Sequence, residues 1–151
     1  MIYYNALDLI GNTPILNLKQ IGYPNLFVKL EKTNPGGSIK DRAALYMING
    51  AEEKGILNKD SVLVEATSGN TGIALAMAGK LKGYKVIIIM PETMSIERRQ
   101  LVKAFGAELI LTDGSKGMAG SIDKTKELLD NYQNLLQELD DLIVQKNNDM
   151  M

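Results

Sequence analysis

Short apolar runs alternate along the chain with longer segments in which apolar residues recur every three or four positions. Three runs, at 62–64, 86–90 and 109–111, are rich in Val, Ile and Leu and are bounded by polar residues, glycine or proline, as buried β-strands are. The segment after each run is expected to be a helix; the first ends near Gly83 and the second runs from Ser95 to Gly106. Such alternation predicts βαβ units. We therefore expect an α/β fold in three layers, with a parallel sheet and helices on both faces.

The same pattern divides the chain into three parts. Residues 1–35 are expected to be an irregular N-terminal segment with one short strand, at 26–31, because turn-forming residues interrupt it. Residues 36–122 are expected to form the α/β domain, which opens with a helix. The apolar face of that helix is carried by Ala44, Met47, Ile48 and Ala51, and Gly55 closes it.

Residues 123–151 are expected to form an acidic, C-terminal amphipathic helix with a frayed tail. They contain seven acidic and three basic residues. A broad apolar stripe either packs on the chain's own sheet or forms a dimerisation seam, and the pattern leaves both open. The residues of this stripe are Leu128, Tyr132, Leu135, Leu139 and Leu142, flanked by Leu129, Leu136 and Ile143.

Composition excludes several kinds of chemistry. The chain has 151 residues, with 17 Lys and Arg against 18 Asp and Glu, a balance that does not favour nucleic acid as a partner. It contains no Cys and no His, which excludes a thiolate nucleophile, a Ser-His-Asp triad and a His-ligated metal, and we expect no metal site. The N-terminus lacks the pattern of a secretory signal, and the longest apolar run is too short to cross a bilayer. We expect a cytoplasmic protein without a membrane partner.

Two glycine-rich loops are candidates for function. In the first, Lys40 follows Gly36, Gly37 and Ser38; a lysine in a partly buried site can become a nucleophile and a base, although most lysines in such positions are surface residues. The second, at 67–72, lies between a predicted strand and a predicted helix. Its backbone N–H groups and hydroxyls would suit a carboxylate or a phosphate, or would merely cap the helix. It matches neither common nucleotide-binding loop motif.

Taken together, the motifs resemble those of cysteine synthase (O-acetylserine sulfhydrylase), in the pyridoxal-phosphate enzymes with the tryptophan-synthase β-type fold, fold type II. The resemblance covers roughly residues 5–130, and six motifs stand in the family's order. They are Gly11-Asn12-Thr13-Pro14, the segment from Lys29 to Arg42, the segment from Glu65 to Gly72, the segment from Met90 to Arg99, Phe105-Gly106-Ala107-Glu108, and the segment from Thr112 to Gly120. Ala66 departs from the family by standing where many relatives have Pro.

The resemblance implies an activity and a role for individual residues. Lys40 matches the lysine that forms a Schiff base with pyridoxal phosphate and removes the substrate α-proton, and Asn70 matches the asparagine that bonds the cofactor's phenolic oxygen. The implied reaction is a β-replacement, in which O-acetylserine loses acetate and sulfide adds to give cysteine. A cysteine-degrading, sulfide-releasing relative would look almost the same. The residues implied to bind the substrate α-carboxylate are Thr67, Ser68, Gly69 and Thr71.

The length of the chain departs from the family, whose members are about twice as long. The resemblance implies that the cofactor-phosphate loop and the residue at the pyridine nitrogen lie in the missing half. We therefore expect a truncated or frameshifted product, or a fragment, with little activity alone. One alternative is a complete small protein whose terminal helix covers an orphaned surface. Another is a non-catalytic domain that associates with itself, as a homo-oligomer through that helix, or with a full-length relative.

Overall fold

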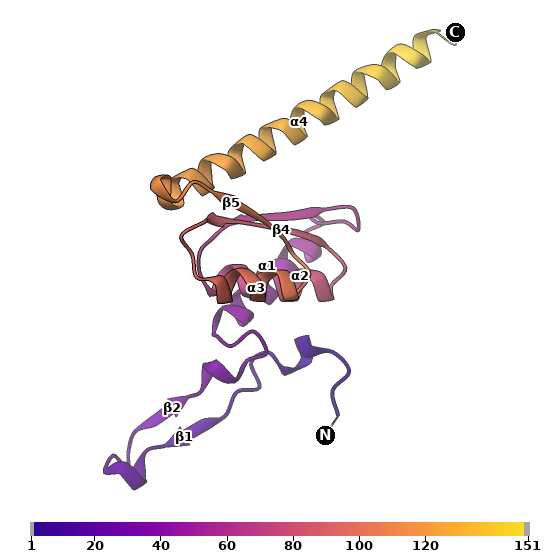
Figure 1. Ribbon diagram of the computed structural model, residues 1–151. Coiled ribbons are helices and arrows are strands. Elements are labelled where there is room, and N and C mark those ends of the chain that lie inside the picture. The colour runs from indigo at the N-terminus through magenta and orange to yellow at the C-terminus, as the bar shows by residue number, and fades with distance from the viewer. Residues whose placement is uncertain (1, 150–151) are drawn as a thin grey trace.

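The computed structural model describes residues 2–149, and within the last helix it describes side chains as far as Asn134. Figure 1 shows these elements in chain order. The strands are β1 Ile15–Asn17, β2 Phe27–Lys29, β3 Val62–Ala66, β4 Lys85–Pro91 and β5 Glu108–Thr112. The α-helices are α1 Lys40–Glu53, α2 Asn70–Leu81, α3 Ile96–Ala104 and α4 Gly117–Asp149, and short 3-10 turns lie at Ala6–Leu9, Lys19–Ile21, Glu31–Thr33 and Gly114–Lys116.

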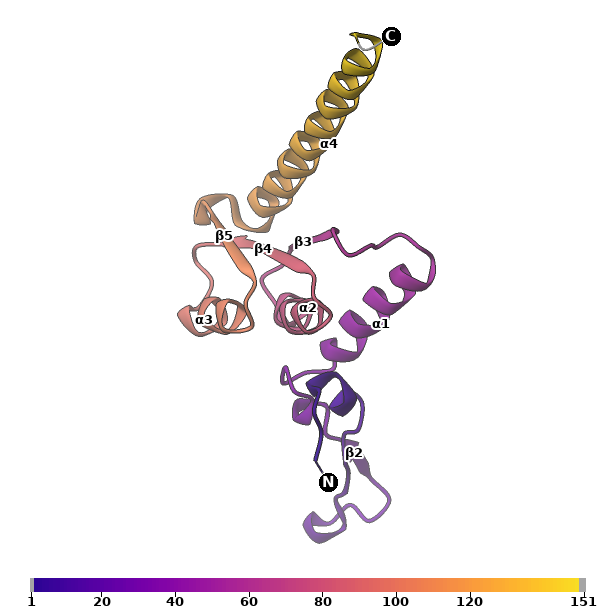
Figure 2. The ribbon, with the colours of Figure 1, turned by 90° about the vertical axis from the view of Figure 1, so that its right-hand side faces the viewer.

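The three predicted strands form one parallel sheet in the order β3–β4–β5, which confirms the expected α/β fold. Val62 is opposite Lys85 in the first pairing, and Ile87 is opposite Glu108 in the second. Helices α1, α2 and α3 lie on one face of the sheet, and α4 crosses the other face (Figure 2). The three-layer arrangement predicted from the sequence is therefore present.

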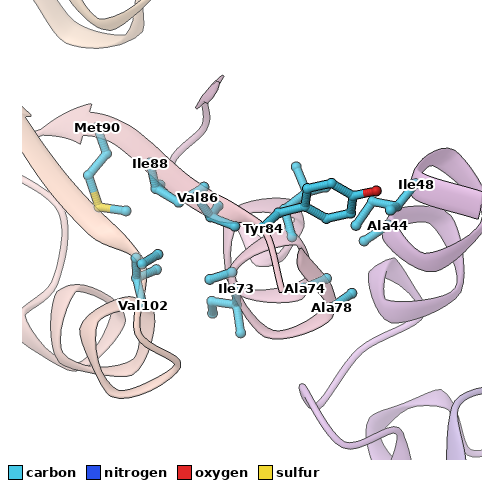
Figure 3. Close-up of a cluster of buried hydrophobic side chains, with 13 residues drawn as sticks. Ala44, Ile48, Ile73, Ala74, Ala78, Tyr84, Val86, Ile88, Met90 and Val102 are labelled. Atoms are coloured by element: carbon cyan, nitrogen blue, oxygen red, sulfur yellow. The ribbon is translucent and has the colours of Figure 1, made fainter. Parts of the chain in front are cut away.

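The core follows from the composition of β4 and α2. Val86, Ile88 and Met90 alternate along β4 and belong to the cluster on the α2 side, while Ile89 is fully buried but lies outside that cluster. Each such side chain contributes roughly 1.5–3 kcal/mol when it leaves water. Figure 3 shows the side chains of α1 and α3 converging on the same cluster around α2.

Helix α2 is buried on nearly all sides because it is made mostly of small residues. Every residue from Gly72 to Gly79 is buried, between the sheet, α1 and α3. Beyond its end, Tyr84 donates a hydrogen bond of 2.8 Å to Glu52 of α1, and Lys82 forms an ion pair with the same carboxylate. These bonds lower the pKa of Glu52, the larger effect coming from Lys82, and they join α1 to the end of α2.

The N-terminal segment contains a β-hairpin instead of the single strand expected there. β1 and β2 pair antiparallel, with Ile15 opposite Lys29 and Asn17 opposite Phe27. All residues of both strands are exposed, and the hairpin projects from the helical layer on the side away from the sheet (Figure 1). The prediction missed β1 because three residues after Pro14 show too little alternation to mark a strand; pairing with β2 supplies the hydrogen bonds.

The C-terminal helix begins at Gly117, six residues before the predicted boundary. Near its start, the hydroxyls of Ser121 and Thr112 are 2.8 Å apart, which ties the helix to β5. Leu128 is half-buried, whereas Leu129 and Tyr132 are about half exposed. The other apolar positions of the predicted stripe, Leu135, Leu136, Leu139, Leu142 and Ile143, lie outside the described side chains. Among residues 2–149, no helix has both the length and the apolar composition that a bilayer crossing requires.

Candidate active site

Lys40 is the first residue of α1, and its side chain is exposed. Its backbone N–H donates to the hydroxyl of Ser38 at 3.1 Å. The loop before it turns sharply at Gly37, whose φ of +83° favours glycine, and the N–H of Gly37 donates to the carbonyl of Asn34 at 2.8 Å. The loop is therefore ordered by its own backbone, and it presents the lysine at the start of a helix.

Asp41 holds the same loop in place through a hydrogen bond to the loop backbone. Its side chain is fully buried, and Oδ2 accepts a hydrogen bond of 2.6 Å from the backbone N–H of Gly36. A β-carbon on Gly36 would lie 2.5 Å from Oδ1 of Asp41, so only glycine fits there. Burial is the main reason that the pKa of Asp41 is raised. Its Oδ1 has no hydrogen-bond partner in the described structure. The sequence analysis did not assign Asp41 a role; an acidic residue directly after a glycine loop was the available signal.

A charged cluster joins this loop to the N-terminal segment. Arg42 donates from Nε to Oε2 of Glu31 at 2.8 Å and from Nη2 to Oε1 at 2.9 Å. Thr13 donates its hydroxyl proton to Oε1 of Glu31 at 2.8 Å, and Arg42 also donates to the carbonyl of Gly11 at 2.9 Å. The bonds from Arg42, and then those from Thr13, lower the pKa of Glu31 to about 2. The motif at 11–14 and the motif at 29–42, which both contribute to the family resemblance, are thus in contact.

The second glycine-rich loop leaves the carboxyl end of β3 and leads into α2. The N–H of Thr67 still donates to the carbonyl of Ile89 at 3.0 Å, so the loop starts from a fixed point of the sheet. The hydroxyl of Thr67 accepts from the N–H of Gly69 at 3.3 Å, and no side chain caps the helix. Arg98 of α3 donates to the carbonyl of Ser68 at 2.9 Å and holds the loop from the side. The sequence analysis did not foresee this contact.

Five of the predicted site residues, Thr67 to Thr71, are consecutive and lead into α2, whereas Lys40 lies on another helix. Thr67, Ser68 and Gly69 form one turn, and Thr71 follows it in the first turn of α2. Lys40 and Asn70 are both exposed at the first positions of neighbouring helices, α1 and α2, which pack together. Within the described residues, no hydrogen bond or ion pair connects Lys40 to the loop. The same part of the chain holds no group of acidic residues arranged to bind a metal ion.

Comparison with known proteins identifies the family. A model described as "Pyridoxal-phosphate dependent enzyme" matches residues 6–145, which is most of the chain. The chain belongs to the pyridoxal-phosphate dependent enzyme family. Its resemblance to cysteine synthase is also shown. A cysteine synthase of a Flavobacterium species is 54% identical over 136 residues, which are 89% of this chain and 44% of that protein. A probable cysteine synthase of Bacillus subtilis is 51% identical over 136 residues, 88% and 44% of the two chains.

Solved structures give the same family and the same fold. A hydrogen sulfide-producing enzyme from Fusobacterium nucleatum superposes with a TM-score of 0.77 at 50% identity, over 87% of this chain and 43% of that one. A cysteine synthase from Entamoeba histolytica superposes with a TM-score of 0.80 at 45% identity, over 87% and 41% of the two chains. The chain therefore spans less than half the length of the relatives that it matches.

The cofactor of this family is pyridoxal phosphate, and the residues present suit part of it. Lys40 offers an exposed amine for an aldehyde, and Asn70 offers an exposed amide for an oxygen substituent of a ring. A β-carbon built on Gly37 or on Gly69 would meet no atom within 4 Å, so a ligand can approach the backbone of both loops. The donor set therefore fits the reactive end of the cofactor.

Proposed function

We propose that this chain carries the lysine-bearing part of a β-replacement enzyme that makes cysteine from O-acetylserine and sulfide. The observation that carries the proposal is the position of Lys40, exposed at the start of α1 behind a loop held by Gly36 and Asp41. The sequence around it supports the reaction class, because the chain is 54% identical to a cysteine synthase over 136 residues.

Each residue of the two loops has a part in this proposal. The amine of Lys40 would hold the cofactor by its aldehyde group. Once the substrate has displaced it, the amine of Lys40 would take the α-proton of the substrate. Asn70 would donate to the ring oxygen. The backbone N–H groups and hydroxyls at 67–71 would bind the substrate α-carboxylate at the start of α2, where the helix dipole favours an anion. Pyridoxal phosphate, when bound, supplies the electron sink for the carbanion.

A second candidate activity is release of sulfide from cysteine. The specific support is the 50% identity to the hydrogen sulfide-producing enzyme, which nearly equals the identity to the cysteine synthases. A third candidate is a non-catalytic domain that assembles with itself or with a full-length relative. Self-association through α4 and the cytoplasmic location expected from the sequence both stay predictions.

The test of the proposed site is a covalent trap. The chain is mixed with pyridoxal phosphate, reduced with borohydride and digested, and the labelled peptide is identified by mass. We expect label at Lys40, loss of that label in Lys40→Ala, and an unchanged free energy of unfolding, because the side chain is exposed. The control is Lys59→Ala, which removes another exposed lysine and should leave the label in place. Equal labelling of several lysines would contradict the assignment.

A second measurement tests the reaction itself, separately from attachment of the cofactor to Lys40. We expect the 151-residue chain to make cysteine from O-acetylserine and sulfide far more slowly than the longer relatives, because fixed positioning of the reacting groups supplies about 7–11 kcal/mol of barrier lowering. Turnover at the rate of the longer relatives would contradict this expectation. Release of sulfide from cysteine, without synthesis, would favour the second activity.

A further inference from the structure

The loop at 67–71 is held by a residue that lies outside it. Arg98 belongs to the first turn of α3, which packs beside α2 (Figure 2), and its Nη1 donates to the carbonyl of Ser68 at 2.9 Å. Among the described residues, this is the one hydrogen bond that joins the loop to another helix. Both helices belong to this chain, so the contact does not depend on the half that the longer relatives add.

The start of α3 is itself fixed, so Arg98 reaches the loop from a rigid support. Arg99 donates from Nε to the carbonyl of Met94 at 2.9 Å. The N–H of Met94 in turn donates to the carbonyl of Pro91, the last residue of β4, at 3.1 Å. Val102, farther along α3, is fully buried in the core. These contacts tie the helix that carries Arg98 to the central strand of the sheet.

The peptide that joins Ser68 to Gly69 is held at both of its polar atoms. Its carbonyl oxygen accepts from Arg98, and its N–H donates to the hydroxyl of Thr67 at 3.3 Å. Thr67 is fixed by packing, because a β-carbon on Gly72 would lie only 2.7 Å from its Cγ2. Without the bond from Arg98, the long bond to Thr67 alone would set the orientation of this peptide.

Gly69 allows this peptide to turn over once it is released. The φ of Gly69 is −113°, and a half-turn of the peptide would bring it to roughly +65°, a left-handed value that glycine adopts readily. Such a flip exchanges the directions of the carbonyl of Ser68 and the N–H of Gly69. It places an acceptor where the loop now has a donor, and a carbonyl oxygen repels a carboxylate.

The donors assigned to the substrate are free in this arrangement. Within the described part of the chain, the hydroxyls of Ser68 and Thr71 and the side-chain amide of Asn70 make no hydrogen bond. No side chain caps α2, which is 12 residues long. These groups can converge on one anion only if the backbone that carries them keeps a single conformation.

We propose that Arg98 is a positioning residue for the substrate carboxylate. It fixes the Ser68–Gly69 peptide and thereby keeps the donors of the loop in the arrangement that binds the anion. The inference rests on the proposed function, which assigns the α-carboxylate to this loop. It adds a residue on α3 that acts through the loop backbone without contacting the substrate.

The first test measures the mobility of the peptide by ¹⁵N relaxation at residue 69, without ligand. We expect a rigid amide, with an order parameter of about 0.85, in the native chain and in Arg98→Lys, which keeps a donor. Arg98→Met should give a value below about 0.6 or exchange broadening. Adding Gly69→Ala to Arg98→Met should restore rigidity, because alanine disfavours the left-handed φ and its β-carbon meets no atom within 4 Å.

The control for this test is Lys103→Met. Lys103 is exposed in the last turn of α3, so the substitution removes a positive charge from the same helix away from the loop. The amide of residue 69 should stay rigid in this variant. Arg98 is also exposed, so none of the substitutions at either position should disturb folding.

The second test measures the carboxylate site itself by titration with L-serine, which carries the α-carboxylate and α-amine of the substrate. We expect saturable shifts of the amides at 69–71 with L-serine and none with L-serinamide, which lacks the carboxylate. Arg98→Met should weaken binding about tenfold, because the binding conformation is then only partly populated. Arg98→Lys and Lys103→Met should bind within about twofold of the native chain.

Several results would overturn the inference. They are an equally rigid amide in Arg98→Met, a mobile amide that Gly69→Ala does not restore, equal affinities of Arg98→Met and Lys103→Met, and the absence of saturable shifts at 69–71 in the native chain. The labelling of Lys40 is measured separately, so it would stand if this inference failed. Saturable shifts without selective labelling of Lys40 would contradict the proposed function alone.

Discussion

Gly79 lies where α2 packs most closely on the sheet, and replacing it with alanine tests the packing directly. A β-carbon there would lie 2.6 Å from Cγ2 of Val86 and 3.0 Å from Cδ1 of Leu63, whereas carbon atoms in good contact are about 3.5–4.0 Å apart. Val86 is 2% exposed on the central strand, and its branched side chain has little freedom to rotate away. Alanine should therefore strain the core.

The magnitude follows from two opposing effects. Overpacking of this kind costs about 1–3 kcal/mol, and alanine recovers about 1 kcal/mol of helix propensity over glycine. We expect Gly79→Ala to lower the free energy of unfolding by about 1 kcal/mol. Gly50→Ala in α1 is the matched control, because its β-carbon would meet no atom within 4 Å. That variant should gain about 1 kcal/mol.

Thermal unfolding followed by circular dichroism distinguishes the two outcomes. A difference of about 2 kcal/mol between the variants corresponds to roughly 4–8 °C in Tm for a chain of this size. The order of the two Tm values decides the matter, since both variants make the same chemical change. A Tm for Gly79→Ala equal to or above that of Gly50→Ala would show that α2 lies farther from the sheet than described.

Three further predictions concern the loops. The pKa of Glu31 is lowered from 4.5 to about 2 in the folded chain, so the ionised carboxylate stabilises the fold fully above pH 4.5, and this stabilisation disappears as the pH falls toward 2. Urea unfolding of Glu31→Gln should lack this loss of stability at low pH, and a pH profile unchanged from that of the native chain would argue against the Arg42 cluster. Asp41 has a raised pKa, so its charge destabilises the fold as the pH rises; the stability of Asp41→Asn relative to the native chain should increase between pH 4 and 7, and a decrease would contradict its burial. Gly37→Ala should lower the free energy of unfolding by about 1–2 kcal/mol because the φ of Gly37 is +83°, whereas Gly69→Ala should lower it less, since the φ of Gly69 is −113° and its surroundings are equally open. Equal unfolding midpoints for the two variants would contradict these backbone conformations.

The sequence predicted those elements whose pattern is local and strong. The β-branched run of β4 has to be a buried strand, and its parallel pairing with β3 and β5 follows from the helices between them. The family could be inferred from ordered motifs, and the comparisons confirm it. The role of each predicted site residue is still a prediction.

The features that were missed depend on contacts between distant parts of the chain. β1 becomes a strand only by pairing with β2, and the lowered pKa of Glu31 depends on Arg42 and Thr13, which periodicity cannot connect. Asp41 shows the same limit, because its burial is a property of the packed loop and helix. A helix was expected after the strand at 109–111, but the sequence did not show that it continues unbroken from Gly117 into the C-terminal helix expected at 123–151.

The order of the strands in the sheet has a consequence for how this part of the family folds. Each strand pairs with the next one along the chain, so every pairing closes a single strand–helix–strand unit and none waits for a distant segment. Val62 and Lys85 are 23 residues apart, and Ile87 and Glu108 are 21 apart, so each pairing forms more slowly than a local helical contact but needs only one intervening helix. On the ribosome, β3, α2 and β4 can assemble as soon as they leave the exit tunnel, and β5 then adds to an existing edge. A growing chain can thus shield its most aggregation-prone strand, β4, before synthesis of a longer relative is half complete.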